Sequence, residues 1–282
     1  MKKNPEIWQK TEQSITKKYR KTLWNKFIRA VKEYELISEG DKIAVCISGG
    51  KDSMLMAKLM QLLQRYSEVS FDVVYLVMDP GYNRENRIKI EDNARLLNIP
   101  ITIFETDIFD AANNAEKYPC YLCARMRRGH LYSQAKKLGC NKIALGHHFS
   151  DVIETTVMSM FYGAQLQAMI PKLHSSHFEG MELIRPLYCV HEDDIISWAE
   201  HNELEFLRCA CRFTEMQDRC DSDETGKRLE TKRLIKELKK KNPNIEKSIF
   251  NSLHVVHIDT FPGYKTKGER HSFLDNYGSS EK

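Results

Sequence analysis

The sequence predicts an α/β fold: a Rossmann-like, open and mainly parallel sheet of five strands with helices on both faces. Apolar runs rich in β-branched residues alternate with segments of helical spacing, and the links between them are short. Hydrophobic residues make up 41% of the 282 residues, which is enough to bury the core of one ordinary domain with appended segments. Alternating strands and helices form βαβ units, and right-handed crossovers place the helices on both faces of the sheet.

The predicted elements follow in order along the chain. Residues 1–41 are predicted to form a basic helical arm, because Leu23, Phe27 and Val31 are spaced four residues apart. The α/β core spans residues 42–190, with strands over 42–47, 71–78, 101–105 and 142–145 and helices over 54–64, 84–97, 121–138 and 151–162. Residues 191–262 are predicted to form a C-terminal helical region, with helices over 191–202, 225–240 and 243–253. The polar stretch 263–282 is expected to be a disordered or loosely docked tail.

Composition indicates the compartment. No apolar run approaches the roughly 18 residues that a membrane span needs. The N-terminus is basic but lacks the apolar segment of a secretory signal. We therefore expect a cytoplasmic protein with no membrane partner, whose eight cysteines are thiols or metal ligands rather than disulfides.

The positive charge is concentrated in three windows of the chain. Residues 10–32 carry eight basic residues and one acid, residues 117–142 carry seven and none, and residues 227–247 carry nine and three. Solvated helix faces would explain any one window. Three windows together, with aromatic residues such as Tyr19 and Trp24 interleaved in the first, favour a nucleic acid as partner.

A glycine turn follows the first predicted strand, in the segment Ile47–Met54 (ISGGKDSM). Backbone N–H groups converge at such a turn, and the positive end of the following helix attracts an anion. The loop of P-loop NTPases does not fit, because Val45 stands where that loop needs a glycine and Asp52 where it needs Ser or Thr. A GxGxxG dinucleotide loop is also absent from this segment. The turn therefore predicts a different phosphate site, with an ordinary strand-to-helix turn as the alternative.

The hexapeptide SGGKDS in this turn resembles the pyrophosphate loop of the ATP pyrophosphatase (PP-loop) superfamily. Members of that superfamily cleave ATP between the α and β phosphates and adenylate a substrate oxygen. The resemblance implies that backbone amides and serine hydroxyls hold the leaving pyrophosphate, from Ser48, Gly49, Gly50 and Ser53. Lys51 would neutralise developing charge and Asp52 would hold Mg²⁺, so both are catalytic candidates as well as ATP contacts.

Asp79 ends the second predicted strand, where sheets of this kind meet the adenosine. It is therefore a candidate ATP contact. The alternative is a turn-forming role, because Asp79-Pro80-Gly81 is typical turn chemistry.

Cys120 and Cys123 form a CxxC pair, whose two thiols can bind one metal ion from a tight turn. The arginines that follow favour the thiolate form of these cysteines. The alternative to a metal-binding pair is two buried thiols on a helix. No second CxxC exists, so further ligands would come from the cluster Cys209, Cys211 and Cys220. The other three cysteines are interpreted as core thiols: Cys46, Cys140 and Cys189. Four thiolates would make a closed zinc site and three would leave one metal position open, and spacing does not decide between them.

One ordered set of motifs makes the resemblance more specific. The segment Cys120–Gly163 carries the CxxC pair, an arginine run and a GHHxxDxxET block, and AMIPKL and IRPL follow it. Together with SGGKDS, this order resembles the tRNA 2-thiocytidine synthetase family. The resemblance implies a PP-loop core (adenine nucleotide alpha hydrolase-like), use of ATP and Mg²⁺, and a 4Fe–4S cluster held by Cys120, Cys123 and Cys209. The family has CxxC where this chain has Cys209-Ala210-Cys211, so Cys211 is the runner-up third ligand.

The same resemblance implies further site residues. Gly146, His147 and Asp151 of the GHH block are predicted to contact ATP or its Mg²⁺, and the alternative is that Ser150 and Asp151 only cap a helix. The predicted tRNA contacts are basic residues of the arm and of the arginine run: Lys17, Lys18, Arg20, Lys21, Arg125, Arg127 and Arg128.

The resemblance implies 2-thiolation of a cytidine in the tRNA anticodon loop. The C2 oxygen would attack the α-phosphate of ATP and release pyrophosphate, and sulfide at an open iron position would then displace AMP from C2. A sulfur donor such as a cysteine desulfurase is implied, and a homodimer is typical of the family. A lysidine-synthetase-like enzyme that uses another nucleophile, and a non-enzymatic zinc or Fe–S RNA-binding protein, are the alternatives. The first leaves the cysteines without a role, and the second leaves SGGKDS without one.

Overall fold

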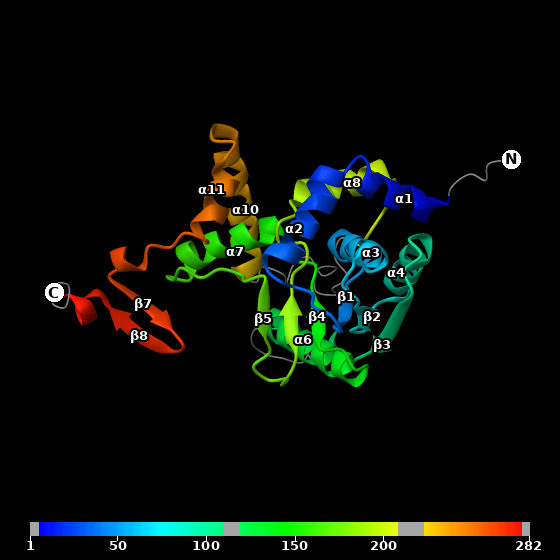
Figure 1. The fold of residues 1–282 in the computed structure, drawn as a ribbon, viewed down its shortest axis with the longest axis horizontal. Coiled ribbons are helices and arrows are strands. Elements are labelled where there is room, and N and C mark those ends of the chain that lie inside the picture. The colour runs from blue at the N-terminus through cyan, green and yellow to red at the C-terminus, as the bar shows by residue number, and fades with distance from the viewer. Residues whose placement is uncertain (1–5, 110–118, 208–222, 278–282) are drawn as a thin grey trace. The chain divides into compact units, whose positions relative to one another are not determined.

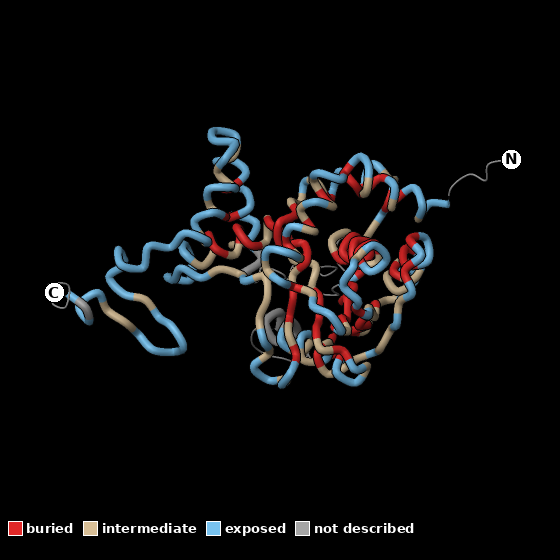
Figure 2. The backbone as a smooth tube through the Cα atoms, in the orientation of Figure 1, coloured by how far each residue is buried: buried red, intermediate tan, exposed pale blue. Residues whose placement is uncertain are grey.

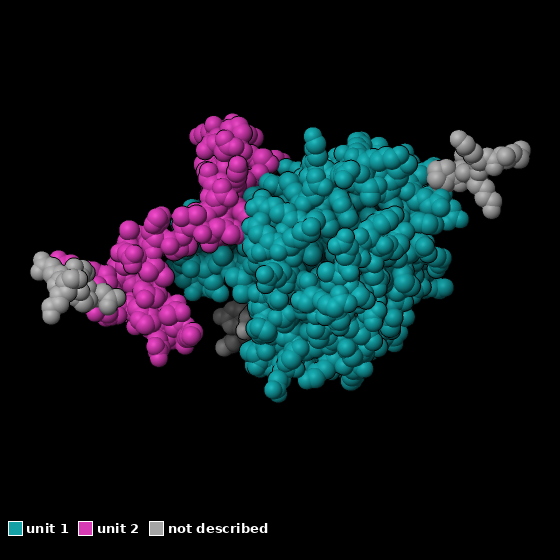
Figure 3. Space-filling model, viewed as in Figure 1, with its two compact units in different colours: residues 1–233 teal, residues 234–282 magenta. Residues whose placement is uncertain are grey.

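The computed structural model of the chain describes residues 6–109, 119–207 and 223–277 (Figure 1). It divides into two compact units, residues 1–233 and residues 234–282, which are distinguished by colour in Figure 3. The larger unit contains the whole α/β core, and each unit is described separately below.

The central sheet has six strands in the order β3-β2-β1-β4-β6-β5. Five strands are parallel: β1 (Lys42–Ile47), β2 (Asp72–Asp79), β3 (Ile101–Glu105), β4 (Lys142–Ala144) and β6 (Glu182–Ile184). The sixth, β5 (Lys172–His174), is antiparallel to β6 at the edge. The mainly parallel α/β sheet is confirmed, but it has six strands rather than the predicted five, and β5 and β6 match none of the predicted strand ranges. Since β5 has only three residues, it shows no alternation that a sequence pattern could reveal.

Strand β1 lies at the centre of the sheet and pairs with β2 on one side and β4 on the other. The order of strands therefore reverses at β1, which is where open α/β sheets bind ligands beyond the carboxyl ends of their strands. Figure 2 shows buried residues concentrated along β1 and the helix that follows it.

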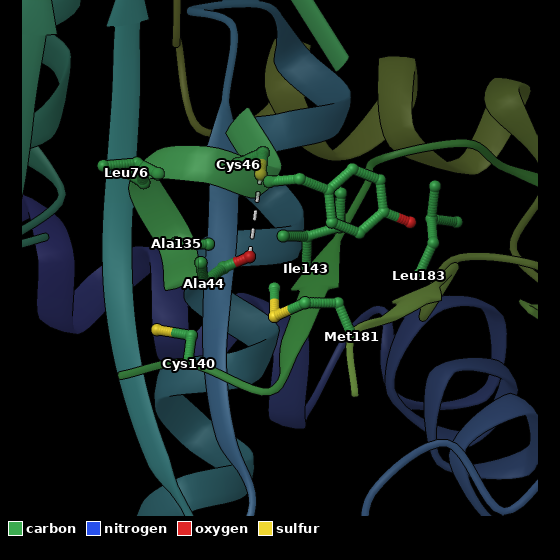
Figure 4. Packing of buried hydrophobic residues seen from close by; sticks show 9 residues of the cluster. Ala44, Cys46, Leu76, Ala135, Cys140, Ile143, Met181 and Leu183 are labelled. Carbon is green, nitrogen blue, oxygen red and sulfur yellow. Dashed lines mark hydrogen bonds between the residues drawn. The ribbon is translucent and has the colours of Figure 1, made fainter. Parts of the chain in front are cut away.

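Helices cover both faces of the sheet. They are α3 (Lys51–Tyr66), α4 (Arg84–Leu96), α6 (Pro119–Lys137), α7 (Phe149–Tyr162) and α8 (Glu192–His201). Ala44 and Cys46 of β1 pack with Tyr132 and Ala135 of α6 in one buried cluster (Figure 4). Side chains alternate along a strand, and α3 also packs on β1, so we assign α3 to the opposite face. Each observed boundary lies within three residues of the predicted one.

The arm consists of α1 (Ile7–Thr16), the π-helical turn η1 (Arg20–Trp24) and α2 (Asn25–Glu33). Its apolar face is buried, because Leu23 and Phe27 have no exposed surface. Lys58 of α3 is also fully buried, and its Nζ lies 2.6 Å from Glu12 Oε1 of α1. The arm is therefore attached to the core by apolar packing and one buried ion pair.

The chain continues with α10 (Asp223–Lys241), α11 (Ile245–Ser252) and the 3₁₀ turn η2 (Ile258–Thr260). It ends with β7 (Gly263–Thr266), β8 (Glu269–Ser272) and the 3₁₀ turn η3 (Phe273–Asn276). Strands β7 and β8 pair antiparallel, so this part of the predicted disordered tail has regular structure. Lys267 and Gly268 connect the strands with positive φ angles of 48° and 90°, the conformation of a tight hairpin turn. Among the described residues, no helix has the length and apolar character of a membrane span.

Candidate functional site

The glycine turn lies between β1 and α3, at the carboxyl end of the sheet. Gly49 has a φ of +84°, and Gly50 is the N-cap of α3 with no side-chain hydrogen bond capping the helix. The hydroxyl of Ser53 accepts a bond from the amide of Ser48 at 3.1 Å and donates to the carbonyl of Gly50 at 2.9 Å. The hydrogen bonds of Ser53 therefore stabilise the turn. The N-terminus of α3 has the partial positive charge that attracts an anion.

Gly146 brings the GHH block against this turn. A Cβ atom on Gly146 would lie only 3.2 Å from the amide nitrogen of Ser53 and 3.3 Å from the carbonyl carbon of Asp52. These contacts are tighter than most Cβ atoms make, so a glycine suits the close approach of the backbone after β4 to the start of α3. The predicted neighbourhood of SGGKDS and the GHH block is present.

A cavity of about 320 Å³ opens beside the turn. Its polar lining comes from four segments, and its apolar wall includes Ile47, Met78 and Leu145. Among the described residues, three of its buried polar atoms have no hydrogen-bond partner: Asp52 Oδ1, His147 Nδ1 and Arg127 Nε. Burial lowers the pKa of His147 to about 4, so this imidazole is neutral near pH 7. Buried polar groups are rarely left unpaired, so the three atoms indicate a polar ligand.

Asp151 has two roles in the structure. Its Oδ2 accepts a bond from the His148 amide at 2.9 Å, and its own amide donates to His148 Nδ1 at 3.3 Å, which forms a capping box at the start of α7. The capping alternative is therefore confirmed for Asp151, whereas His148, not Ser150, is the N-cap. Asp151 also lines the 320 Å³ cavity, so capping does not remove it from the predicted ATP site.

Lys51 lies between two carboxylates on the other side of the turn. Its Nζ is 3.2 Å from Asp52 Oδ2 and 3.1 Å from Glu192 Oε1 at the start of α8. Burial alone would lower the pKa of Lys51, but the two carboxylates raise it above its usual value. Lys51, Asp52 and Glu192 line a second cavity of about 850 Å³, which also reaches Ser48 and Leu207. Sequence reasoning missed Glu192, because its place in the first turn of a helix already has a structural explanation.

Asp79 forms the turn that its sequence context allows. Its Oδ1 accepts bonds from the amides of Gly81 at 2.9 Å and Tyr82 at 2.7 Å, and its Oδ2 pairs with Arg87 at 3.0 Å. These contacts confirm the turn-forming role. A contact between Asp79 and ATP stays a prediction, although Met78 and Tyr82 on either side line the 320 Å³ cavity.

The predicted cluster ligands are only partly described. Cys120 and Cys123 lie in the first two turns of α6, while Cys209, Cys211 and Cys220 lie outside the described residues. Within the described part of the chain, no group of three or more His, Cys, Asp or Glu is placed to hold a metal ion. The three other cysteines are buried free thiols, as predicted: Cys46, Cys140 and Cys189. Burial raises the pKa of Cys46 to about 12 and that of Cys189 to about 11, so both are protonated thiols.

The predicted tRNA contacts fall into two groups. Six are exposed on the arm or on α6: Lys17, Lys18, Arg20, Lys21, Arg125 and Arg128. Arg127 instead lines the 320 Å³ cavity, and its Cζ lies 5.2 Å from the ring centroid of Phe109. Arg127 is therefore placed to contact a ligand inside the cavity rather than the outer surface of an RNA.

Comparison with known proteins agrees with this geometry. A family model described as a PP-loop domain matches residues 15–211. The chain is 37% identical over 250 residues to a tRNA-cytidine(32) 2-sulfurtransferase of Vibrio campbellii, covering 86% of this chain and 78% of that one. It is 35% identical over 237 residues to a protein of the same name from Citrifermentans bemidjiense, covering 83% of this chain and 89% of that one.

Among solved structures, the U34-tRNA thiolase NcsA of Methanococcus maripaludis, determined with its [4Fe-4S] cluster, has a similar fold. The TM-score is 0.64 at 21% identity, over 91% of this chain and 87% of that one. At that identity the likeness supports the fold, and the sequence relatives support the family. The chain belongs to the PP-loop family, and within it to the family of the tRNA-cytidine(32) 2-sulfurtransferases.

Proposed function

We propose that this protein is an ATP-dependent tRNA sulfurtransferase that converts a cytidine of the tRNA anticodon loop to 2-thiocytidine. The single observation that carries the proposal is the cavity beside the glycine turn. Three buried polar atoms that have no hydrogen-bond partner among the described residues belong to its lining, on a chain whose relatives carry this activity in their name. An anticodon-loop base can leave its stack and enter such a cavity, whereas a base within a duplex cannot.

The residues of the turn would divide the activation step between them. The C2 oxygen of the cytidine attacks the α-phosphate of ATP, the bond between the α and β phosphates breaks, and pyrophosphate leaves. The amides of Gly49 and Gly50 would bind the leaving pyrophosphate at the helix N-terminus. Lys51 would offset the charge that develops on it, and Asp52 would hold Mg²⁺ through Oδ1, which accepts no hydrogen bond from the described residues.

Arg127 of the cavity lies on the same helix as Cys120 and Cys123. It lies four residues after Cys123 in α6, one helical turn and about 6 Å along the helix axis. Cys120 and Cys123 are three residues apart in the same helix. Thiolates are the ligands that Fe–S clusters prefer, so this pair fits a 4Fe–4S cluster with Cys209, or Cys211, as the third ligand. Held by three cysteines, such a cluster would supply sulfide as the nucleophile that replaces AMP at C2.

The proposed partners follow from the same chemistry. Exposed lysines and arginines of the arm and of α6 would bind tRNA phosphates, led by Lys17, Lys18 and Arg125. A donor such as a cysteine desulfurase would supply the sulfur. Because tRNA is a cytoplasmic substrate, we place the reaction in the cytoplasm, and a homodimer stays a prediction.

The test is a reconstituted reaction with the anaerobically purified full chain, its cluster, Mg²⁺, ATP, sodium sulfide and an unmodified tRNA transcript. We expect tRNA-dependent release of pyrophosphate, and 2-thiocytidine in the digested tRNA by mass spectrometry. The variant Asp52→Asn should lose both signals while retaining its fold and its iron.

Other outcomes would point elsewhere. Pyrophosphate release without 2-thiocytidine, and with an amine adduct when amino acids are added, would favour a lysidine-synthetase-like reaction. A protein that binds tRNA but never converts ATP to AMP would refute the enzymatic proposal.

A further inference from the structure

Two basic residues of α10 lie against carboxylates of the nucleotide site. Arg228 pairs with Asp151, and its Nε lies 3.2 Å from Oε2 of Glu154, both on α7. One turn further along α10, the Nζ of Lys232 lies 2.5 Å from Oε2 of Glu192 on α8. All of these residues belong to the unit formed by residues 1–233.

Glu192 extends this contact to the glycine turn. One of its oxygens binds Lys232, and the other binds Lys51 at 3.1 Å. Burial alone would raise the pKa of Glu192, but the hydrogen bond from Lys232 and the charge of Lys51 lower it to about 2. Glu192 is therefore ionised, and it fixes the position of the lysine that is expected to meet the phosphates.

Arg228 pairs with a carboxylate that is buried, that of Glu154. Its side chain is only 7% exposed, and burial raises its pKa above the usual value. Arg228 is the partner that the structure gives its carboxylate, and the same guanidinium neutralises Asp151 in the cavity wall. The guanidinium of Arg228 thus pairs with two carboxylates, Asp151 in the cavity wall and the buried Glu154.

The charges of the site explain what the pair contributes. Three carboxylates line the two cavities beside the turn, Asp52, Asp151 and Glu192, and a fourth, Glu154, shares the guanidinium of Arg228 with Asp151. ATP brings further negative charge to the same place. Without Arg228 and Lys232, these carboxylates would repel the phosphates. Glu192 would also lose its contact with Lys232, and the position of Lys51 would be less well fixed.

We propose that Arg228 and Lys232 are positioning residues of the ATP site, which fix its carboxylates and Lys51 and offset their charge so that the turn accepts the triphosphate. The proposal rests on the proposed function, because it concerns the binding of ATP. Neither residue has to touch ATP for this effect.

The test measures the dissociation constant of a non-hydrolysable ATP analogue with Mg²⁺, by calorimetry on the full chain purified with its cluster. We expect Arg228→Gln to weaken binding about ten-fold and Lys232→Gln to weaken it less, because Glu192 keeps Lys51 as a second partner. Arg228→Lys keeps the charge and should restore most of the affinity. Arg233→Gln, on an exposed residue of the same helix, is the matched control and should bind as the parent does.

A double variant separates positioning from simple stability. Arg228→Gln removes the cation paired with the buried Glu154 carboxylate and lowers stability, whereas Arg228→Gln with Glu154→Gln removes both charges of this pair. We expect the double variant to recover the thermal stability of the parent but not its ATP affinity. Parental affinity in the double variant, or in Arg228→Gln itself, would overturn the inference. A parent chain that binds no ATP would instead remove the proposed function, so the two failures are distinguishable.

Discussion

Replacing Gly49 by alanine tests the geometry of the glycine turn directly. Gly49 has a φ of +84°, and a Cβ there would lie 2.6 Å from Ile90 Cγ1 and 2.9 Å from Leu207 Cδ1. The left-handed backbone costs an L-residue about 1 kcal/mol, and overpacking a well-packed site costs about 1–3 kcal/mol. Ile90 is only 1% exposed and has little room to move. We expect Gly49→Ala to lower the free energy of unfolding by about 2–4 kcal/mol.

Gly50→Ala is the matched control for this change. Gly50 has a φ of −79°, and its Cβ would meet its nearest atoms, Leu207 O and Ser48 Oγ, at 3.7 Å. Alanine is the poorer N-cap, so a loss of at most about 1 kcal/mol is expected. Urea unfolding followed by circular dichroism measures both variants, and pyrophosphate release should fail only in Gly49→Ala. The reasoning is refuted if Gly49→Ala unfolds at the parental urea concentration, or if both variants lose the same stability.

Three further changes follow from burial and from the cysteine assignments. The pKa of His147 is lowered to about 4 in the folded chain, so the unfolded chain binds a proton more readily as the pH falls below 6.5. The free energy of unfolding should therefore fall by about 1.5 kcal/mol between pH 6.5 and 5. Urea unfolding of His147→Gln should lack this fall in stability. Glu12→Gln leaves the buried Lys58 ammonium without its carboxylate and should cost about 3 kcal/mol, measured by the same unfolding experiment. Cys120→Ala should lose iron and acid-labile sulfide in metal analysis, whereas Cys140→Ala, which changes a buried core thiol, should keep both; equal iron in the two variants would contradict the ligand assignment.

Local patterns made most of the fold predictable. The helix α4 was expected over 84–97 and spans Arg84–Leu96, because its apolar spacing and its first-turn chemistry lie within one segment. The strands β5 and β6 have three residues each, too few for alternation, and β6 pairs with β4, about 40 residues earlier. Pairing over such distances depends on the whole sheet, so no local pattern reveals it.

The candidate site also has a part that the sequence predicts and a part that it does not. SGGKDS is a contiguous motif, and the structure places it at the expected turn between β1 and α3. The partners of this motif come from far along the chain: Glu192 is 141 residues from Lys51, and Arg228 is 77 residues from Asp151. Each looks like an ordinary helix residue in sequence, and only packing brings them to the carboxylates and the lysine of the turn.

The three basic windows of the sequence therefore do not form one uniform surface. Lys17 and Lys18 of the first window are exposed, as a contact with RNA phosphates requires. In the second window Arg127 lines the 320 Å³ cavity, and in the third Arg228 and Lys232 pair with carboxylates beside the glycine turn. We therefore expect the basic residues to serve two different polyanions, tRNA at the exposed lysines and ATP at the turn. Because phosphate contacts release counterions, rising ionic strength should weaken tRNA binding to the exposed lysines steeply.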